Sequence, residues 1–337
     1  MRLVIDAMGG DNAPSAPVAG AVRAVKELKT EIILTGDEKI IKNELAKYTY
    51  DEKFISIIHT DEVIENEDEP VAAVKKKKNS SMVVALKYLH DGNADAMLSM
   101  GNTGALLTAG LLIVGRIKGI KRPCLGALLP SQEGPVLLAD SGANTNCKPI
   151  CLVQFAMMGS LYMSDIMGIK NPKVGLLSNG TEKEKGDALV KSAHPLIEKL
   201  PVNFIGNIEG RDIMEGNAHV IVCDGFTGNV VLKTIEGMGG VVSRKVKGIF
   251  KHSVFTKLGA LFVLKGLQEF KKSMDYREYG GAPMLGLKQT VIKGHGSSDE
   301  KAVFSAILQA KKCVDENITE KITESLKNSD MCEGSEE

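Results

Sequence analysis

The chain alternates between two kinds of hydrophobic pattern, which are separated by glycine-rich turns. Short runs of β-branched and aliphatic residues predict strands at Leu3–Ile5, Ile32–Leu34, Phe54–Ile58, Ala96–Leu98, Val136–Ala139, Val174–Leu177, Val202–Ile205 and Val220–Val222. Longer stretches with apolar residues at helical spacing predict helices at Val18–Leu28, Ser81–His90, Ala105–Val114, Ile150–Met167 and Asp187–Leu200. This repeated order of strand, loop and helix predicts an α/β protein whose mostly parallel sheet is covered by helices on both faces.

Two segments depart from this order. Between Val230 and Lys272 the pattern predicts no strand, and nine basic residues stand against two acidic ones. We therefore expect residues 230–275 to form a helical pair that projects from the core. Residues 331–337 predict an acidic tail after the last helix. No repeat or low-complexity linker divides the remainder, so residues 1–330 are expected to form a single α/β domain.

The composition of the 337-residue chain is typical of a globular protein, with 43% hydrophobic and 25% charged residues. Its 42 basic and 42 acidic residues cancel, so the net charge gives no indication of a nucleic-acid partner. The first residues predict a strand rather than a signal peptide, and the six cysteines are expected to be free thiols in the cytoplasm. No apolar run approaches the roughly 18 residues of a membrane-spanning helix.

Small, polar, glycine-rich sequences follow five of the predicted strands and precede the last helix. They lie at Asp6–Pro14, Ser99–Gly104, Asp140–Pro149, Ser178–Gly186, Asp224–Asn229 and Gly294–Ser298. Glycine lets backbone N–H groups approach a ligand closely, and a helix N-terminus favours negative charge. Because such loops gather beyond the carboxyl ends of parallel strands, they predict a phosphate site, with Gly101–Gly104 as its best cradle. Each turn taken singly also fits an ordinary connection between strand and helix.

Other kinds of site are disfavoured. The chain has no G-x-G-x-x-G after its first strand, no G-x-x-x-x-G-K-[ST] and no G-x-S-x-G, which argues against a dehydrogenase, an NTPase and a serine hydrolase. Cys147 and Cys151 have no nearby histidine or second cysteine pair to complete a zinc site. Aspartates at strand ends typically cap helices or brace turns, and a bare carboxylate repels phosphate. We expect neither a metal nor a cofactor.

The glycine-rich loops, in their order along the chain, resemble those of the bacterial acyl-[acyl-carrier-protein]–phosphate acyltransferases. The resemblance runs from Met1 to about Ala310 and is carried by Asp6–Asp11, Gly101–Gly104, Gly142–Asn144, Cys147–Pro149, Gln154–Ala156, Met158–Ser160, Asp224–Asn229 and Gly294–Ser297. It implies a homodimer with a Rossmann-like fold that transfers a long-chain fatty acyl group from acyl carrier protein to inorganic phosphate. The product would be acyl phosphate for phospholipid synthesis. Met100, Ser141 and Ser178–Asn179 depart from the usual family residues, which bears on the detailed shape of the pocket but leaves the reaction class unchanged.

Such a reaction needs no protein nucleophile, because the phosphate dianion is itself nucleophilic. The enzyme has to hold phosphate against the thioester carbonyl and stabilise the developing oxyanion. Loop placement and the resemblance together assign phosphate binding to Asn102, Thr103, Gly104, Gly142 and Asn144.

The resemblance also implies the catalytic groups. Lys185 stands at the family's Lys-Gly position and is our choice for the catalytic cation, with Lys183 as the competing residue. A solvated charge run is the other interpretation of this loop. Asn229 would donate to the carbonyl oxygen or to phosphate, and it also fits an N-cap before Val230. His295 is a secondary candidate that could bind phosphate, act as an acid or pack its loop.

The basic helical pair predicts two partner surfaces. Arg244, Lys245 and Lys247 would attract the acidic acyl carrier protein. Farther out, Val254, Leu258, Leu261 and Phe262 form an apolar side flanked by lysines, which predicts reversible contact with the inner face of the cell membrane. A buried dimer or helix-pair seam explains the same spacing.

Two other functions fit the sequence. A phosphate acyltransferase that takes its acyl group from acyl-coenzyme A would share the phosphate site. A non-catalytic scaffold could instead recruit enzymes of lipid synthesis to the membrane through the basic helical pair.

Overall fold

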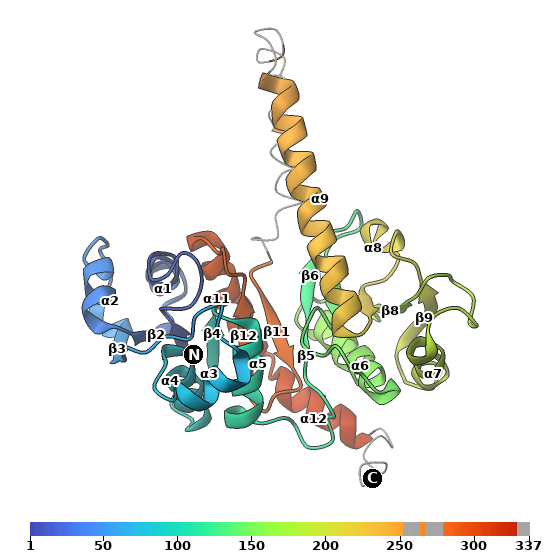
Figure 1. Cartoon of the computed structure of the whole chain (residues 1–337), viewed down its shortest axis with the longest axis horizontal. Coiled ribbons are helices and arrows are strands. Elements are labelled where there is room, and N and C mark those ends of the chain that lie inside the picture. The colour runs from blue at the N-terminus through green and yellow to red at the C-terminus, as the bar shows by residue number, and fades with distance from the viewer. Residues whose placement is uncertain (252–255, 257–262, 264, 267–278, 329–337) are drawn as a thin grey trace.

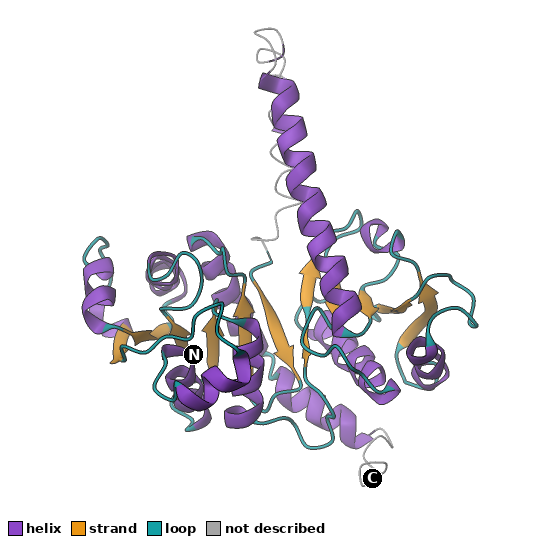
Figure 2. Ribbon diagram, in the orientation of Figure 1, coloured by secondary structure: helices purple, strands orange, loops and turns teal. Residues whose placement is uncertain are grey.

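The computed structural model describes the chain except for residues 252–255, 257–262, 264, 267–278 and 329–337. It is an α/β protein with two sheets side by side, each flanked by helices, as Figures 1 and 2 show. The predicted fold class is therefore confirmed, and all eight predicted strands are present. The division of the strands into two sheets was not predicted.

The larger sheet has seven strands in the order β3-β2-β1-β4-β12-β11-β5. Their bounds are Arg2–Asp6 (β1), Glu31–Gly36 (β2), Ile55–His59 (β3), Ala96–Ser99 (β4), Cys124–Leu125 (β5), Gly281–Leu285 (β11) and Thr290–Gly294 (β12). Strands β3, β2, β1, β4 and β12 run parallel, whereas β11 is antiparallel to both β12 and β5. The loops after β1, β4 and β12 consequently meet at one edge.

The smaller sheet has five strands in the order β6-β7-β10-β8-β9. Their bounds are Ala127–Leu129 (β6), Val136–Ala139 (β7), Lys173–Leu177 (β8), Asn203–Ile208 (β9) and Val220–Val222 (β10). Only β6 is antiparallel to its neighbour. Gly126 alone separates β5 of the larger sheet from β6 of the smaller one, so the two sheets are joined directly at this residue.

Helices cover both faces of each sheet. Their bounds are Ser15–Leu28 (α1), Glu38–Leu45 (α2), Pro70–Lys76 (α3), Ser81–His90 (α4), Thr103–Ala109 (α5), Pro149–Asp165 (α6), Ala188–Ile197 (α7), Asp212–Glu215 (α8), Gly225–Lys251 (α9), Glu300–Asp315 (α11) and Ile318–Asn328 (α12). A 3₁₀ turn spans Glu52–Phe54, and a π-helical turn at Gly110–Val114 continues α5. On β1, Leu3 and Ile5 join one buried cluster and Val4 another, as expected for a strand that is covered on both sides.

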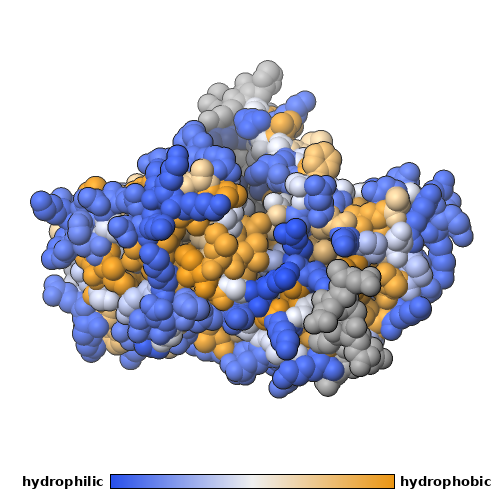
Figure 3. All heavy atoms as spheres, turned by 60° about the horizontal axis from the view of Figure 1, so that its bottom comes forward, coloured by the Kyte–Doolittle hydropathy of each residue, from blue (hydrophilic) through white to orange (hydrophobic). Residues whose placement is uncertain are grey.

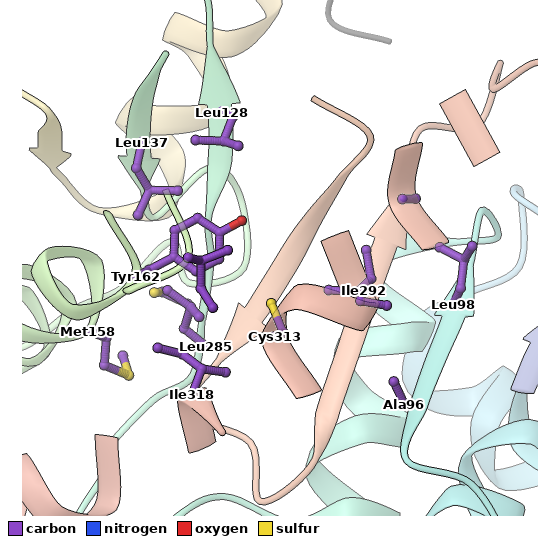
Figure 4. Close-up of a cluster of buried hydrophobic side chains, with 14 of the residues drawn as sticks. Ala96, Leu98, Leu128, Leu137, Met158, Tyr162, Leu285, Ile292, Cys313 and Ile318 are labelled. Carbon is purple, nitrogen blue, oxygen red and sulfur yellow. The ribbon is translucent and has the colours of Figure 1, made fainter. Parts of the chain in front are cut away.

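One hydrophobic cluster extends under both sheets and holds them together (Figure 4). It includes Leu137 of β7 and Met158 of α6 as well as Leu285 of β11 and Ile292 of β12. Within this cluster the Gln309 side chain of α11 donates to the hydroxyl of Tyr162 of α6 at 2.7 Å. The buried tyrosine hydroxyl therefore has a hydrogen-bond partner. This continuous core fixes how the two sheets meet.

Helix α9 rises from the smaller sheet and projects beyond the body of the molecule (Figure 1). It forms the first arm of the projection that we predicted for residues 230–275. Most of the remaining residues of the predicted helical pair, and the tail at 331–337, lie outside the described residues. No helix in the described part of the chain is long and apolar enough to cross a bilayer.

Helix α9 begins in tight contact with the loop after β7. A Cβ atom built on Gly228 would lie 1.9 Å from the Asp140 carbonyl oxygen, whereas one built on Gly237 would meet nothing within 4 Å. Gly228→Ala therefore forces backbone to move, and we expect it to lower the free energy of unfolding by about 1–3 kcal/mol. Gly237→Ala, the matched control, should raise it by up to about 1 kcal/mol through helix propensity. Urea unfolding of both variants would reveal equal effects if α9 is not docked in this way.

Candidate active site

A pocket of about 450 Å³ lies where the two sheets meet. The loops after β4 and β12 line it from the larger sheet, while β6, the loop after β7 and the first turns of α9 line it from the smaller one. Among the residues predicted from sequence, it brings together Asn102, Thr103, Gly104, Gly142, Asn229 and His295. Asn144 and Lys185 do not line it.

The wall formed by the loop after β7 is built around the buried carboxylate of Asp140. This side chain accepts hydrogen bonds from the backbone N–H groups of Leu125, Gly142, Ala143 and Asn144 and from the Asn144 amide. Burial raises the pKa of the Asp140 carboxyl, and these donors oppose the rise. Asn144 is buried, and its amide also donates to the Pro123 carbonyl at 2.7 Å. In this structure Asn144 therefore shapes the loop, and Gly142 reaches the pocket.

The Gly101–Gly104 turn forms the facing wall. The Asn102 side chain caps α5 by accepting from the Ala105 N–H at 3.0 Å, and its amide donates to the carbonyls of Glu65, Asn66 and Asp68. A Cβ atom on Gly104 would lie 2.6 Å from the Pro70 side chain, which accounts for the glycine. Thr103 is exposed at the pocket. The turn thus presents backbone N–H groups and one hydroxyl to a ligand.

Lys293 at the end of β12 supplies a buried cation that the sequence reasoning missed. Its side chain is nine-tenths buried, and its ammonium donates to the carbonyls of Met100 and Gly294. The pKa of Lys293 is lowered from 10.5 to about 8, chiefly by burial and also by Lys233, while the carboxyls of Asp6 and Asp11 oppose this shift. A signal existed in the sequence, because Lys293 stands between the apolar pair Val291–Ile292 and the Gly294 loop.

Helix α9 presents one polar face to the pocket. Asn229, Lys233 and Glu236 lie on it at helical spacing, and the Lys233 ammonium pairs with the Glu236 carboxylate at 2.7 Å. The helix is capped by Asp224, whose carboxylate accepts from Phe226 N and Thr227 N. The N-cap interpretation of Asn229 is therefore wrong, because Asn229 lies inside α9 rather than at its start.

His295 joins the end of β12 to α9. Its Nδ1 lies 2.8 Å from the Ser297 hydroxyl, and its Nε2 lies 3.7 Å from the Glu236 carboxylate. Burial lowers the pKa of His295, although Glu236 opposes that effect. The imidazole is therefore neutral at pH 7 and braces its loop while it lines the pocket.

Lys185 lies in the exposed loop after β8. Strand β8 neighbours β10 in the smaller sheet, so this loop emerges at the same edge as the start of α9. Lys183 in the same loop pairs with Glu198 at 2.6 Å. The catalytic role of Lys185 stays a prediction.

The strand-end aspartates brace turns, as expected. Asp6 is buried and accepts from the hydroxyls of Ser81 and Ser99, both at 2.6 Å. In the described ranges no three His, Cys, Asp or Glu side chains gather as a metal site requires. The five cysteines described there are free thiols.

One of the two predicted partner surfaces lies on α9. Arg244, Lys245 and Lys247 are exposed on its outer half. The proposed membrane-contact residues Val254, Leu258, Leu261 and Phe262 lie outside the described residues.

Comparisons with known proteins agree with this fold. The model of the family described as "Fatty acid synthesis protein" matches residues 1–321. A phosphate acyltransferase of Alkaliphilus oremlandii is 52% identical over 324 residues, which cover 96% of this chain and 97% of the relative. Another from Clostridioides difficile is 49% identical over 325 residues, 96% of each chain.

A solved phosphotransacetylase from Streptococcus pyogenes has the same fold. It superimposes with a TM-score of 0.61 at 18% identity, and the match covers 94% of each chain. The fold and the family match together define the protein as an acyltransferase. The chain belongs to the phosphate acyltransferase family of fatty acid synthesis.

The burial of Lys293 predicts a pH-dependent stability. Because the unfolded lysine regains its ordinary pKa, the unfolded chain binds the extra proton, and the wild type gains stability as the pH rises from about 8 toward 10.5. Lys293→Met removes this dependence. The free energy of unfolding of the variant, relative to wild type, should fall by about 2 kcal/mol between pH 7.5 and pH 10.

Chemical denaturation at the two pH values measures this change. Lys288→Met is the matched control, since Lys288 is exposed on the turn before β12 and should show no such dependence. A constant difference between Lys293→Met and wild type would contradict the charge burial.

Proposed function

We propose that the enzyme transfers a long-chain fatty acyl group from acyl carrier protein to inorganic phosphate and releases acyl phosphate for phospholipid synthesis. The observation that carries this proposal is the pair of lysines, Lys293 and Lys233, on two sides of a pocket lined with glycine-rich turns. The names of the relatives, which are phosphate acyltransferases, support the acceptor.

A phosphate dianion suits this pocket electrostatically. The Lys293 ammonium pays a desolvation cost and is destabilised further by Lys233. A bound dianion would offset both the desolvation of the Lys293 ammonium and its repulsion by Lys233, because its two negative charges balance the two positive ones. The first backbone N–H groups of α5, at Thr103 and Gly104, can add donors, whereas those of Gly101 and Gly142 are engaged by Ser99 and Asp140. The Thr103 hydroxyl can donate a hydrogen bond to the same anion.

The same walls can stabilise the transition state of acyl transfer. Phosphate oxygen attacks the thioester carbonyl, whose oxygen becomes negative and needs a donor in place before the reaction. Asn229 faces Gly142 across the pocket wall, with its Oδ1 3.7 Å from the Cβ position of that glycine. We assign its amide to the carbonyl oxygen. Lys185 would approach from the loop after β8 and supply a further positive charge.

The carrier-protein donor is supported by the basic outer half of α9. Arg244, Lys245 and Lys247 are exposed there, and acyl carrier protein is acidic, so the helix would steer it toward the pocket at the helix base. The proposed contact with the inner face of the cell membrane involves Val254, Leu258, Leu261 and Phe262, which lie outside the described residues. Coenzyme A as donor would use the same phosphate site and is tested below.

A homodimer is the remaining part of the proposal. Hydrophobic side chains gather in the middle of the face that Figure 3 shows, and hydrophilic ones surround them. A contiguous exposed apolar patch of this kind commonly marks an interaction site. A second copy that covers such a face would explain this exposure.

Product trapping tests the reaction. The purified protein is incubated with long-chain acyl carrier protein, with and without phosphate, and acyl phosphate is trapped with hydroxylamine. We expect acyl hydroxamate above the phosphate-free background, and a parallel incubation with acyl-coenzyme A compares the donors. Faster turnover with acyl-coenzyme A than with acyl carrier protein would identify acyl-coenzyme A as the donor instead. Hydroxamate that is independent of phosphate would overturn the function and favour a scaffold.

Substitution of Lys185 by alanine tests its assignment as the catalytic cation. Lys185→Ala should lower turnover on the order of a hundredfold or more, because transition-state donors typically contribute about 3–4 kcal/mol. Its stability should change little, since the side chain is exposed. Lys183→Ala, in the same exposed loop, is the matched control. If Lys183→Ala loses turnover while Lys185→Ala retains it, the catalytic cation is Lys183.

A further inference from the structure

The proposed reaction leaves one proton to be moved. Attack by HPO₄²⁻ forms the C–O bond of the acyl phosphate and breaks the C–S bond of the thioester. The phosphate hydroxyl gives up its proton, and the departing thiolate needs one, so that the products are the acyl phosphate dianion and a free thiol. An alkyl thiolate leaves poorly in a desolvated pocket unless it is protonated as the C–S bond breaks. An acid group in the pocket is therefore required.

Lys293 has the geometry for such a group. Two of its three N–H donors are held by the carbonyls of Met100 and Gly294, which fixes the ammonium at the end of β12. The residue lines the pocket although it is nine-tenths buried, so little water competes for its remaining N–H. In the described part of the chain, the other cation on the pocket wall is Lys233, which is paired with Glu236 and more than half exposed.

We propose that Lys293 is the general acid of the reaction and carries the proton from phosphate to the leaving sulfur. Its ammonium donates a proton to the sulfur as the C–S bond breaks. The resulting amine recovers a proton from the hydroxyl that HPO₄²⁻ brings into the acyl phosphate. No oxidant, reductant or further reactant is consumed, and the lysine ends in its starting state. This assignment rests on the proposed function.

The surroundings of Lys293 suit this cycle. Charged groups face it from three elements: Asp6 at the end of β1, Asp11 in the following loop and Lys233 on α9. Burial and Lys233 favour the amine, whereas the two carboxyls favour the ammonium, and the pKa of Lys293 in the empty pocket is about 8. A bound phosphate dianion raises this pKa toward that of an alkyl thiol. A proton shared between groups of matched pKa moves in either direction at little cost.

His295 is the competing acid on the same wall. Its imidazole is neutral at pH 7 because burial lowers its pKa, and its Nδ1 is engaged by Ser297. A neutral imidazole is a far weaker acid than an ammonium whose pKa is about 8. The geometry and charge therefore favour Lys293.

The test compares leaving groups. Lys293→Arg retains a positive charge for phosphate but cannot give up a proton near neutral pH. We expect it to lower kcat with acyl carrier protein or an acyl pantetheine thioester by about a hundredfold or more. With an acyl thioester of a nitro-substituted thiophenol, whose thiolate needs no proton, the loss should be below about threefold. Lys288→Arg, an exposed lysine outside the pocket, is the matched control and should behave as wild type with both donors.

A pH profile provides the second measurement and needs only acyl carrier protein. Because the ammonium must be present, wild-type kcat should fall at alkaline pH, above the value of about 8 that holds for the empty pocket because bound phosphate raises the pKa of Lys293, and Lys293→Arg should lack this falling limb. Equal losses with both thioesters, or the same falling limb in the variant, would overturn the general-acid role and leave the phosphate acyltransferase function standing. Absence of phosphate-dependent hydroxamate from the wild type with every donor would overturn the function itself.

Discussion

The buried carboxylate of Asp140 is the interaction on which one whole wall of the pocket depends. Its two oxygens can be satisfied only if the chain turns back over them, and this turn delivers the backbone of Gly142 to the pocket. The carbonyl of the same residue packs against Gly228, so the first turns of α9 take their position from it. Asp6 has the corresponding place in the larger sheet, where it holds Ser99 beneath the Gly101 turn. Each sheet thus ends at the pocket in a buried acid that stays out of reach of an anion.

These acids were found from sequence, as were the strands that carry them, because β-branched runs that end in an aspartate and glycines form a strong local pattern. Lys293 was missed because no local sequence pattern indicates that it is buried. A lysine is ordinarily assigned to solvent, and its burial here depends on β4 and β11, which join β12 only in the folded sheet. Strand β11 was missed as well, since Pro283 lies inside it and argues locally against a strand.

The pocket combines two demands that oppose each other. Stability favours a neutral lysine at the end of β12, whereas an anionic substrate and a departing thiolate require a charged one. Burial destabilises the Lys293 ammonium, and a bound phosphate would offset this cost. The charged lysine is therefore least stable when the pocket is empty. The side chain of Asn102 is fully used in structural hydrogen bonds to the first turn of α5 and to the Glu65–Asp68 loop. Its backbone is therefore the part that is left for a ligand.

Helix α9 connects the pocket to a distant surface, and its length of 27 residues corresponds to about 40 Å. A straight helix would transmit any tilt of its outer half to Asn229 and Lys233 at its base. Gly237, Gly239 and Gly240 lie between these two parts of the continuous helix, and a helix resists bending least where its residues are glycines. The helix is therefore expected to bend near its middle rather than to act as a rigid lever. Whatever holds its outer end can move with that end while the spacing of the groups at the base is preserved.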